Sequence, residues 1–475
     1  MAYDRAMGDH ESSFSVLRRT ADPAAVAAIE EAIAHGSDRD LNRINPLAFA
    51  AAHGLDGERT IAAFLHASRL GLFEMQWNVL CPGCGGVLGF NASLKTVHED
   101  IYNCRLCAAG YEPTLDESID VNFTVSPRVR KIAAHDPDSL PPMEYYRQVF
   151  WSSGVALPEG SFEADFAEAT LDIAELPAGS NAFLTVPLPA AKVVVFEPVT
   201  HSAHFLEVEG EPTRERQSLM ITYNEMSPPS GHESFRPGQL RIAFENRTGR
   251  RVIPTVWVLN DRMHEILSRR QPFLTAKRLL SNQTFRDLYR TDALDIDQRL
   301  KILSLTFLFT DLRGSTALYE RVGDLAAYDL VRSHFHILHE IVAEETGAVV
   351  KTIGDAVMAT FVTPDRAIAA ALRMRDGMMR LNEQRGHEDL LLKIGIHEGP
   401  CLAVNLNDRQ DYFGQTVNIA SRVQNLAVDR SIYATEPVVE NAASDALLKE
   451  HGLTPTFQSQ ALKGITERVK IYEIP

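Results

Sequence analysis

The stretch Thr306-Phe-Leu-Phe-Thr-Asp-Leu-Arg-Gly-Ser-Thr316 decides the fold of the C-terminal part of the chain. Apolar strand-forming residues lead to the carboxylate of Asp311, and a glycine and two hydroxyl residues follow before a helical pattern begins. A buried strand that ends in an acid, with a turn and a helix start behind it, can hold a cation beneath a phosphate. Taken alone, this pattern fits many α/β proteins, so further segments must decide its meaning.

Two later segments carry side chains of related chemistry. Lys351-Thr-Ile-Gly-Asp355 places a second carboxylate at a turn between two β-rich runs. Further on, Asn418 and Arg422 lie four residues apart, so they share one face of the helix expected there. Two separated carboxylates indicate a two-metal site for in-line displacement at phosphorus. Asn and Arg side chains suit donation to a charged transition state.

In their order and spacing, these segments closely resemble the catalytic domain of class III adenylate and guanylate cyclases, over residues 301–475. The resemblance implies an α+β, ferredoxin-like sandwich around a central antiparallel sheet. It implies a reaction in which the ribose 3′-oxygen of a nucleoside triphosphate attacks the α-phosphorus and pyrophosphate leaves. Two Mg²⁺ or Mn²⁺ ions per active site are the implied cofactors, held by Asp311, Asp355 and the backbone carbonyl of Leu312.

The same resemblance gives roles to five further residues. Asn418 would orient the ribose, Arg422 would neutralise charge that grows on the α-phosphate, and Lys463 would contact the outer phosphates. Lys351 and Asp411 match the positions that read the purine. Their chemistry fits adenine, because its N1 accepts a hydrogen bond from lysine and its 6-amino group donates one to aspartate. Guanine reverses both edges, and guanylate cyclases of this family generally carry Glu and Cys or a similar pair there.

In the family that the chain resembles, the active site lies between two catalytic domains arranged head to tail. One protomer would supply Asp311 and Asp355, and the other would supply the purine-reading and transition-state residues. Since one chain holds both sets, the resemblance implies a homodimer. Its expected activity is conversion of ATP to 3′,5′-cyclic AMP and pyrophosphate in intracellular signal transduction. A guanylate cyclase, or a cyclase of relaxed specificity, is the alternative within this class.

Four cysteines form two Cys-x2-Cys pairs, Cys81 with Cys84 and Cys104 with Cys107, and nineteen residues separate the pairs. This spacing is typical of a zinc ribbon, expected over residues 76–118. Four thiolates would complete a tetrahedral site, so we expect one structural Zn²⁺ per chain. Disulfides are disfavoured because the chain otherwise predicts a cytoplasmic protein.

The remaining segments predict a multi-domain chain. Residues 1–75 predict a helical segment, either a helix-turn-helix-like unit or a plain helical hairpin. Residues 119–258 contain regularly spaced short strands, typical of a β-sandwich-like regulatory module. Residues 259–300 predict a helical connector that Pro272 should break or kink. The region over 15–258 resembles an uncharacterised domain that precedes cyclase domains in some bacterial proteins, and its expected partner is an unidentified ligand or protein.

Composition limits the classes of function. The chain has 475 residues, a net charge of −16 and a charged content of 23%, as in a globular protein of several domains. The acidic balance argues against a nucleic-acid partner. The alternative from another class is a regulator whose zinc-ribbon region binds nucleic acid or protein. No apolar run approaches the roughly 20 residues that span a bilayer, so we expect a cytoplasmic protein without membrane segments.

Overall fold

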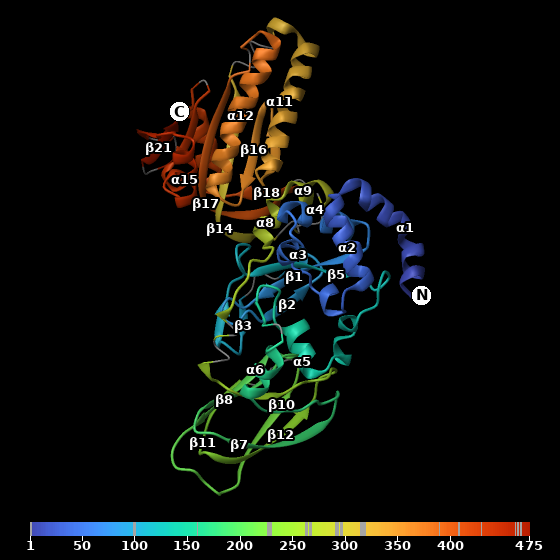
Figure 1. Ribbon diagram of the computed structural model, residues 1–475. Coiled ribbons are helices and arrows are strands. Elements are labelled where there is room, and N and C mark those ends of the chain that lie inside the picture. The colour runs from blue at the N-terminus through green and yellow to red at the C-terminus, as the bar shows by residue number, and fades with distance from the viewer. Residues whose placement is uncertain are drawn as a thin grey trace. The chain divides into compact units, whose positions relative to one another are not determined.

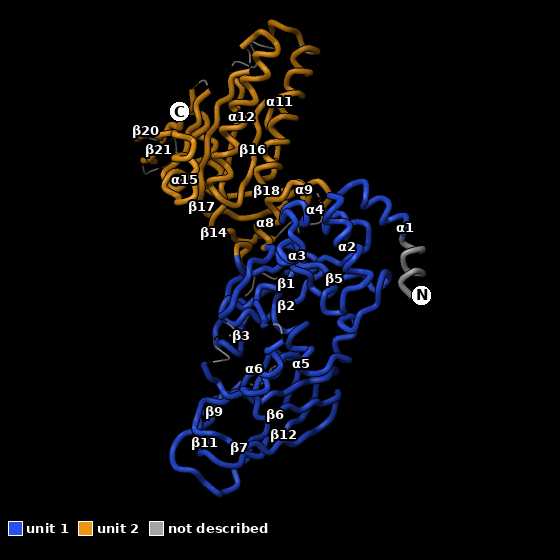
Figure 2. The backbone as a smooth tube through the Cα atoms, in the orientation of Figure 1, with its two compact units in different colours: residues 1–113, 117–274 blue, residues 114–116, 275–475 orange. Residues whose placement is uncertain are grey.

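A computed structural model describes residues 2–97, 101–158, 160–225, 230–261, 265, 268–289, 294, 298–313, 320–388, 390–406, 409–428, 430–460, 462, 465 and 468–475. The chain forms two compact units (Figure 2). The first comprises Met1–Pro113 and Glu117–Leu274, and the second comprises Thr114–Asp116 and Thr275–Pro475.

The first unit begins with four helices, α1 (Ala2–Thr20), α2 (Pro23–His35), α3 (Pro46–His53) and α4 (Gly57–Arg69) (Figure 1). Their starts follow from the sequence, because the side chains of Asp22, Asn45 and Asp56 accept hydrogen bonds from backbone N–H groups of the first turns. Gly54, with φ of 65°, ends α3 in a left-handed conformation and turns the chain into α4. The loops of the first unit contain four short 3-10 helices: η1 (Arg39–Leu41), η2 (Leu94–Thr96), η3 (Ala133–His135) and η4 (Pro137–Ser139).

A three-stranded antiparallel sheet follows the helices. Its strand order is β2 (Val87–Asn91), β1 (Phe73–Leu80) and β5 (Ile119–Val125). The sequence predicted β5 as part of the sandwich-like module at 119–258, and this placement is wrong, since β5 pairs with β1 from Ile119 to Val125. Alternation identified the strand but not its partner. Phe123 instead packs on Phe64 of α4, with ring centroids 5.2 Å apart.

Two further sheets of the first unit pack face to face. One has the order β11–β9–β8–β13–β6 and the other β10–β12–β7. Buried side chains of both sheets form one core, for example Val186 from β7, Val195 from β8 and Ile242 from β12. The strands are β6 (Thr170–Ile173), β7 (Asn181–Leu188), β8 (Lys192–Glu197), β9 (Ser202–Val208), β10 (Gln217–Tyr223), β11 (Ser230–Phe235), β12 (Gly238–Asn246) and β13 (Thr255–Val258).

Residues 126–169 differ from the β-rich prediction. They include α5 (Pro142–Tyr145), a π-helical turn (Tyr146–Phe150) and α6 (Phe162–Ala169). The cause is a cluster of buried aromatic side chains, including Tyr146, Trp151 and Phe166, that covers the second face of the five-stranded sheet at Phe196 and Trp257. Burial of large rings there outweighs any local preference for strands.

The predicted helical connector at 259–300 is helical only in part. Residues 269–274 are extended, because Ala156 and Gln271 donate backbone hydrogen bonds to Arg269 and Gly154, at 3.1 and 3.0 Å. Pro272 lies in this stretch and cannot supply the N–H that a helix needs there. Two short helices follow in the second unit, α8 (Ala276–Leu280) and α9 (Gln283–Leu288).

The second unit is a single sheet covered by helices on both faces. Its order is β15–β16–β14–β17–β19–β21–β20, and β18 pairs with β17; only the β17–β19 pair is parallel among these described pairs. The strands are β14 (Leu300–Leu312), β15 (Ala348–Ile353), β16 (Ala356–Phe361), β17 (Leu392–Leu406), β18 (Arg409–Phe413), β19 (Ile432–Thr435), β20 (Thr456–Gln460) and β21 (Val469–Ile474). The helices are α11 (Asp324–Glu344), α12 (Pro364–Arg385), α13 (Gln415–Leu426), α14 (Glu436–Val439) and α15 (Ala442–Glu450).

Strand β19 shows which helices cover which face. Ile432 and Ala434 belong to the core formed with α11 and α12, whereas Tyr433 belongs to a separate core with Val423 of α13. Since successive strand residues point to opposite faces, α13 lies on the other face from α11 and α12. The helices thus cover both faces of the sheet whose strands carry the candidate site.

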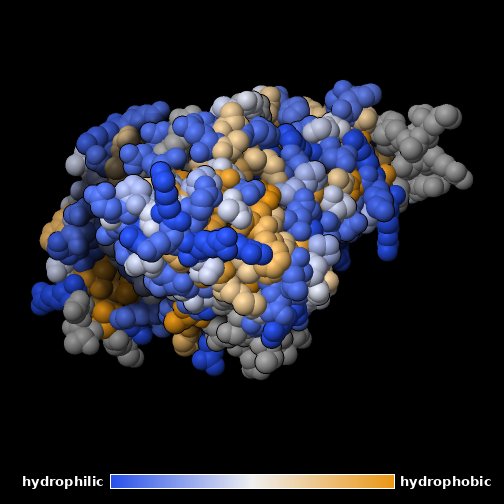
Figure 3. Space-filling model, turned by 90° about the horizontal axis from the view of Figure 1, so that it is seen from below, coloured by the Kyte–Doolittle hydropathy of each residue, from blue (hydrophilic) through white to orange (hydrophobic). Residues whose placement is uncertain are grey.

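Among the described residues, no helix combines the length and the apolar composition that crossing a membrane requires. Figure 3 shows hydrophilic residues over most of the face seen from below, with hydrophobic residues in scattered patches.

Candidate active site and metal centre

The two predicted metal-binding carboxylates lie at the same end of neighbouring strands. Strand β14 pairs with β16 through Phe309 and Met358, and the Oγ1 of Thr310 accepts a hydrogen bond from the backbone N–H of Val357 at 3.1 Å. Continuing the Phe309–Met358 register by two residues places Asp311 opposite Ala356, beside the turn that holds Asp355. The structure therefore brings Asp311 and Asp355 to one edge of the sheet.

The surroundings of both carboxylates fit a cation. The Oδ2 atom of Asp355 is buried and has no hydrogen-bond partner among the described residues. A buried acceptor without a partner is costly, and a bound cation would satisfy it. Asp311 is one-third exposed, and its Oδ2 lies 3.5 Å from the Nζ of Lys393 on the neighbouring strand β17. Sequence reasoning missed Lys393, because its pairing with Asp311 depends on strand register.

A buried imidazole lies near Asp355. His334 on α11 is buried, and burial lowers its pKa to about 4, although the Asp355 carboxylate favours the charged form. The imidazole is therefore neutral at neutral pH.

The purine-reading pair is assembled within one chain. Lys351 on β15 and Asp411 on β18 are sixty residues apart in sequence, yet the lysine Nζ donates a hydrogen bond to the Oδ2 of Asp411. Asp411 is buried and also accepts a hydrogen bond from the backbone N–H of Tyr412 at 2.8 Å. A lysine donor and a carboxylate acceptor thus lie side by side.

Helix α9 holds the backbone under this pair. The Nη2 atom of Arg286 donates to the carbonyl oxygens of Val350 and Gln410, at 3.3 and 2.9 Å. These two residues immediately precede Lys351 and Asp411. Sequence reasoning assigned this segment only to a connector, so the positioning role of Arg286 was missed. No local signal marks this role, because it depends on contacts with distant strands.

Asn418 and Arg422 lie on α13 as expected, the first exposed and the second half-buried. Among the described residues, neither makes a hydrogen bond or ion pair with the two carboxylates or the purine-reading pair. Two glycines of β17 let the helix approach the sheet. A Cβ at Gly395 would lie 2.1 Å from the backbone nitrogen of Gln424, and one at Gly399 would lie 2.8 Å from the Oγ1 of Thr416. Sequence reasoning missed both glycines.

Two remaining predictions have different outcomes in the structure. Leu312 is the last residue of β14, directly after Asp311, so its carbonyl lies at the strand end with the carboxylates. Lys463 lies outside the described residues, as do Gly314 to Thr316 of the motif.

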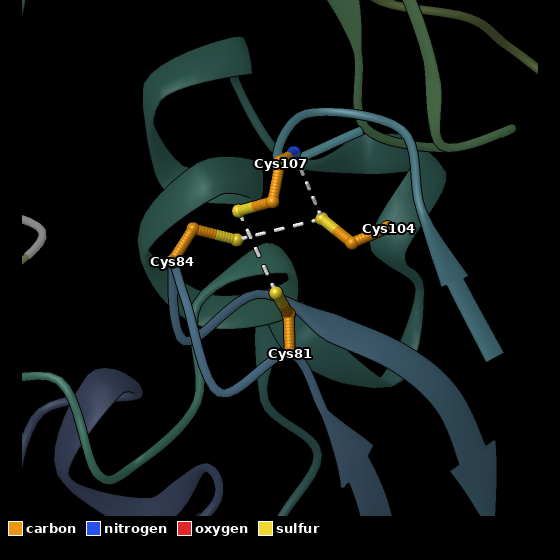
Figure 4. A group of neighbouring side chains, drawn as sticks. All are labelled: Cys81, Cys84, Cys104 and Cys107. Carbon is orange, nitrogen blue, oxygen red and sulfur yellow. Dashed lines mark hydrogen bonds between the residues drawn. The ribbon is translucent and has the colours of Figure 1, made fainter. Parts of the chain in front are cut away.

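The four cysteines come together in the first unit (Figure 4). Their sulfur atoms all lie within 4.8 Å of one another, with 3.6 Å between Cys81 and Cys107 and 3.8 Å between Cys84 and Cys104. Tetrahedral zinc with Zn–S bonds of about 2.3 Å separates its sulfurs by about 3.8 Å, so the four side chains fit this ion. The fit rests on the geometry of the four sulfur atoms.

Backbone groups support the cysteine cluster. The N–H of Gly86 donates to the Sγ of Cys84, and that of Cys107 donates to the Sγ of Cys104, both at 3.4 Å. Arg270 donates to the carbonyl of Gly83 at 2.7 Å and so fixes the first loop. The second loop lies between the short strands β3 (Tyr102–Cys104) and β4 (Ala109–Tyr111). Two loops held in this way are preorganised for one tetrahedral ion.

Comparison with known proteins identifies a family over each part of the chain. The model of the adenylate and guanylate cyclase catalytic domain matches residues 299–470, and that of a family of unknown function, DUF5939, matches residues 7–287. An adenylate cyclase of Anabaena cylindrica is 30% identical over 185 residues, which cover 36% of each protein. Receptor-type adenylate cyclase GRESAG 4.1 of Trypanosoma brucei brucei is 24% identical over 208 residues, covering 36% of this chain and 16% of that protein.

The chain thus spans about a third or less of the length of these curated relatives. Among solved structures, the adenylyl cyclase CyaB from P. aeruginosa is 24% identical and has a TM-score of 0.34, covering 38% of this chain and 96% of that one.

Residues 299–470 are the catalytic domain of a class III nucleotidyl cyclase, and cyclases of this class use divalent cations in catalysis. Taken as a whole, the chain belongs to the family of unknown function DUF5939, whose model covers more than half of its residues.

Proposed function

We propose that the protein is an adenylate cyclase that converts ATP to 3′,5′-cyclic AMP and pyrophosphate. The observation that carries this proposal is the contact between Lys351 and Asp411. Adenine offers an acceptor at N1 and a donor at its 6-amino group, so a lysine donor beside a carboxylate acceptor complements it. With guanine, the lysine donor would face the N1–H donor and the carboxylate would face the O6 acceptor. Neither pair could form a hydrogen bond, which is penalised most at the buried Asp411.

The residues of the catalytic unit divide the chemistry among them. Asp311, Asp355 and the Leu312 carbonyl would hold two divalent cations, which when bound stabilise the attacking 3′-oxygen and the leaving pyrophosphate. Asn418 orients the ribose so that its 3′-oxygen lies in line with the α-phosphorus. Arg422, free of ion pairs with described residues, neutralises the charge that develops on the α-phosphate.

We place these residues in a site shared by two copies of the chain. Arg422 and Asn418 form no hydrogen bond or ion pair with Asp311 or Asp355 within the described residues of one chain. One protomer would therefore supply the carboxylates, and its partner would supply the purine-reading pair, the transition-state pair and Lys463. A homodimer of this kind has two equivalent sites.

Nucleotide selectivity tests the proposal. Purified protein given ATP or GTP separately with Mg²⁺ or Mn²⁺ should form cyclic AMP with a kcat/KM at least about a hundredfold above that for cyclic GMP, because a mismatched polar edge costs several kcal/mol. The double substitution Lys351→Glu with Asp411→Cys should lower or reverse this preference. Lys449→Gln, at an exposed lysine of α15, changes the net charge by the same −1 and is the charge-matched control. Equal rates with both nucleotides would favour the relaxed-specificity alternative, and a GTP preference the guanylate cyclase.

We also propose one structural Zn²⁺ per chain at the four cysteines. Metal analysis of reduced, folded protein should give about one zinc per chain, because four thiolates complete a tetrahedral site. Cys104→Ser should release the zinc and lower the melting temperature of the first unit. Cys401→Ser removes the fifth, buried cysteine of the chain and should leave the zinc content unchanged. Folded wild-type protein without zinc would contradict this assignment.

A further inference from the structure

The first unit contains the sheet β2–β1–β5 (Figure 1). One face of this sheet carries buried polar residues. Strand β5 alternates apolar and polar residues, which ordinarily places the polar side in water. Here the polar residues Asp120, Asn122 and Thr124 are buried as well, with exposed fractions of 0%, 0% and 3%. Their neighbour Asn78 on β1, which pairs with Asp120, is also fully buried. A polar sheet face is therefore enclosed within the protein.

A cavity of about 490 Å³ opens at this face. Ligand sites in proteins commonly have volumes of about 300 to 1,000 Å³. Its lining includes Arg43 before α3, Asn78 of β1, Phe90 of β2 and Gln148 of the π-helical turn. The backbone of residues 148–149 is tied to this site, since Asn42 donates to the carbonyl of Gln148 at 2.9 Å. The cavity is thus built from four separate segments of one unit.

Three buried amide atoms in this lining lack hydrogen-bond partners among the described residues. Neither Nδ2 nor Oδ1 of Asn78 has a hydrogen-bond partner among the described residues, and the Oε1 of Gln148 also lacks one. Asn78 is fully buried and Gln148 is 8% exposed. Buried amides of folded proteins are generally paired. A ligand that offers both an acceptor and a donor would pair these atoms. Asparagine pairs in this bidentate way with the edge of adenine.

The guanidinium of Arg43 supplies a positive charge. It donates from Nη1 to the carbonyl of Val149 and lies over the Phe90 ring, 4.6 Å from the centroid. No carboxylate forms an ion pair with it among the described residues. Burial lowers the pKa of Arg43 to about 10, so the group remains charged at neutral pH. Its backbone has φ of 48°, a left-handed conformation that residues other than glycine adopt uncommonly.

Charge and shape narrow the ligand class. Besides Arg43, the cavity lining carries Arg250 and the carboxyl groups of Glu74, Asp136 and Asp138. Three acids against two guanidinium groups disfavour a polyphosphate and allow a ligand with a single phosphate. Phe90 is 56% exposed and offers a flat face for a ring. These features together fit a ligand that carries one phosphate and a ring. The edge of that ring offers a hydrogen-bond donor next to an acceptor.

We propose that the cavity lined by Arg43, Asn78, Phe90 and Gln148 is an effector site for a purine mononucleotide, separate from the catalytic site. The Asn78 amide pairs with the base edge and Arg43 contacts the phosphate. A cyclic nucleotide carries a single negative charge and fits the lining best. This inference concerns binding to the first unit and does not depend on which nucleotide the second unit cyclises.

Calorimetric titration of the full chain tests the site. Cyclic AMP, cyclic GMP, AMP and GMP are each titrated without added Mg²⁺ or Mn²⁺, and we expect at least one to bind once per chain. Asn78→Leu has a similar volume and should weaken this binding at least tenfold. Because the amide is unpaired without ligand, this variant should melt no lower than wild type.

Two matched variants locate the binding. Asn181→Leu lies on an exposed position of β7 outside the cavity and should bind as wild type. Asp411→Ala alters the catalytic purine site and should also retain the Asn78-dependent binding. Absence of heat with all four nucleotides at millimolar concentration would overturn the proposal, and so would binding that Asp411→Ala abolishes and Asn78→Leu leaves intact.

Discussion

Replacing Asp355 by alanine is expected to reduce cyclic nucleotide formation by at least about a thousandfold, which corresponds to ~4 kcal/mol of transition-state stabilisation. The physical reason is that its buried Oδ2 has no partner among the described residues and is the best candidate on this edge of the sheet for holding a cation. Asp311→Ala should have an effect of the same order. The measurement is the initial rate of cyclic AMP production with saturating ATP and Mg²⁺ or Mn²⁺.

Stability separates loss of the site from loss of the fold. Asp355→Asn keeps the size of the side chain and removes its charge, so its melting temperature should equal or exceed that of wild type while its activity falls. Asp329→Asn is the matched control, because Asp329 is an exposed acid on α11. A folded Asp355→Ala protein with near-native activity would refute the assignment of Asp355 to a cation.

For the predicted purine-reading pair, the sequence identified the two side chains but not the residue that supports them. Lys351 and Asp411 were identified because each lies in a short segment of recognisable order, and the structure brings the two side chains into contact. Their support was not predictable. Arg286 acts on the backbone of Val350 and Gln410 through a tertiary contact, and no local pattern distinguishes it from a solvated arginine of a connector.

Strand register explains two further omissions. Lys393 lies beside Asp311 only because β14 and β17 pair at these residues. Gly395 matters only because α13 crosses β17 with the backbone of Gln424 against it. Both facts require the partner of each strand and helix, which periodicity does not provide. The same limit placed β5 in the wrong sheet, although its alternation was read correctly.

The connector followed its prediction only in part. Apolar residues at helical spacing predicted a helical connector over Asp261–Tyr289 that Pro272 should break or kink, and residues 269–274 are indeed not helical. The sequence did not reveal that Arg269 and Gln271 would form backbone hydrogen bonds with Ala156 and Gly154. Local periodicity thus competes with hydrogen bonds to distant segments. Where a proline lies in the run, the hydrogen bonds to distant segments determine the conformation. The short helices α8 and α9 that remain begin beyond this point.

Mixed dimers of two inactive variants are expected to recover about a quarter of wild-type activity. Asp355→Ala destroys the carboxylate half of a shared site, and Arg422→Ala destroys the transition-state half. In a mixed dimer one site collects both lesions and the other collects neither. Random association makes half of the dimers mixed, each with one intact site of two, which gives the expected quarter if the sites act independently. The rates are measured on co-expressed chains carrying different affinity tags, with tandem purification to verify the mixed species.

A second pairing supplies the matched control. Asp311→Ala and Asp355→Ala both damage the carboxylate half, so each site of their mixed dimer keeps one lesion and no activity should return. The contrast between the two pairings depends only on which chain contributes each residue, since every parent is inactive. Recovery in the control pairing would mean that Asp311 and Asp355 of one site come from different chains, which contradicts the proposed carboxylate half. If verified mixed dimers of Asp355→Ala with Arg422→Ala stay as inactive as their parents, the two halves do not come from different chains.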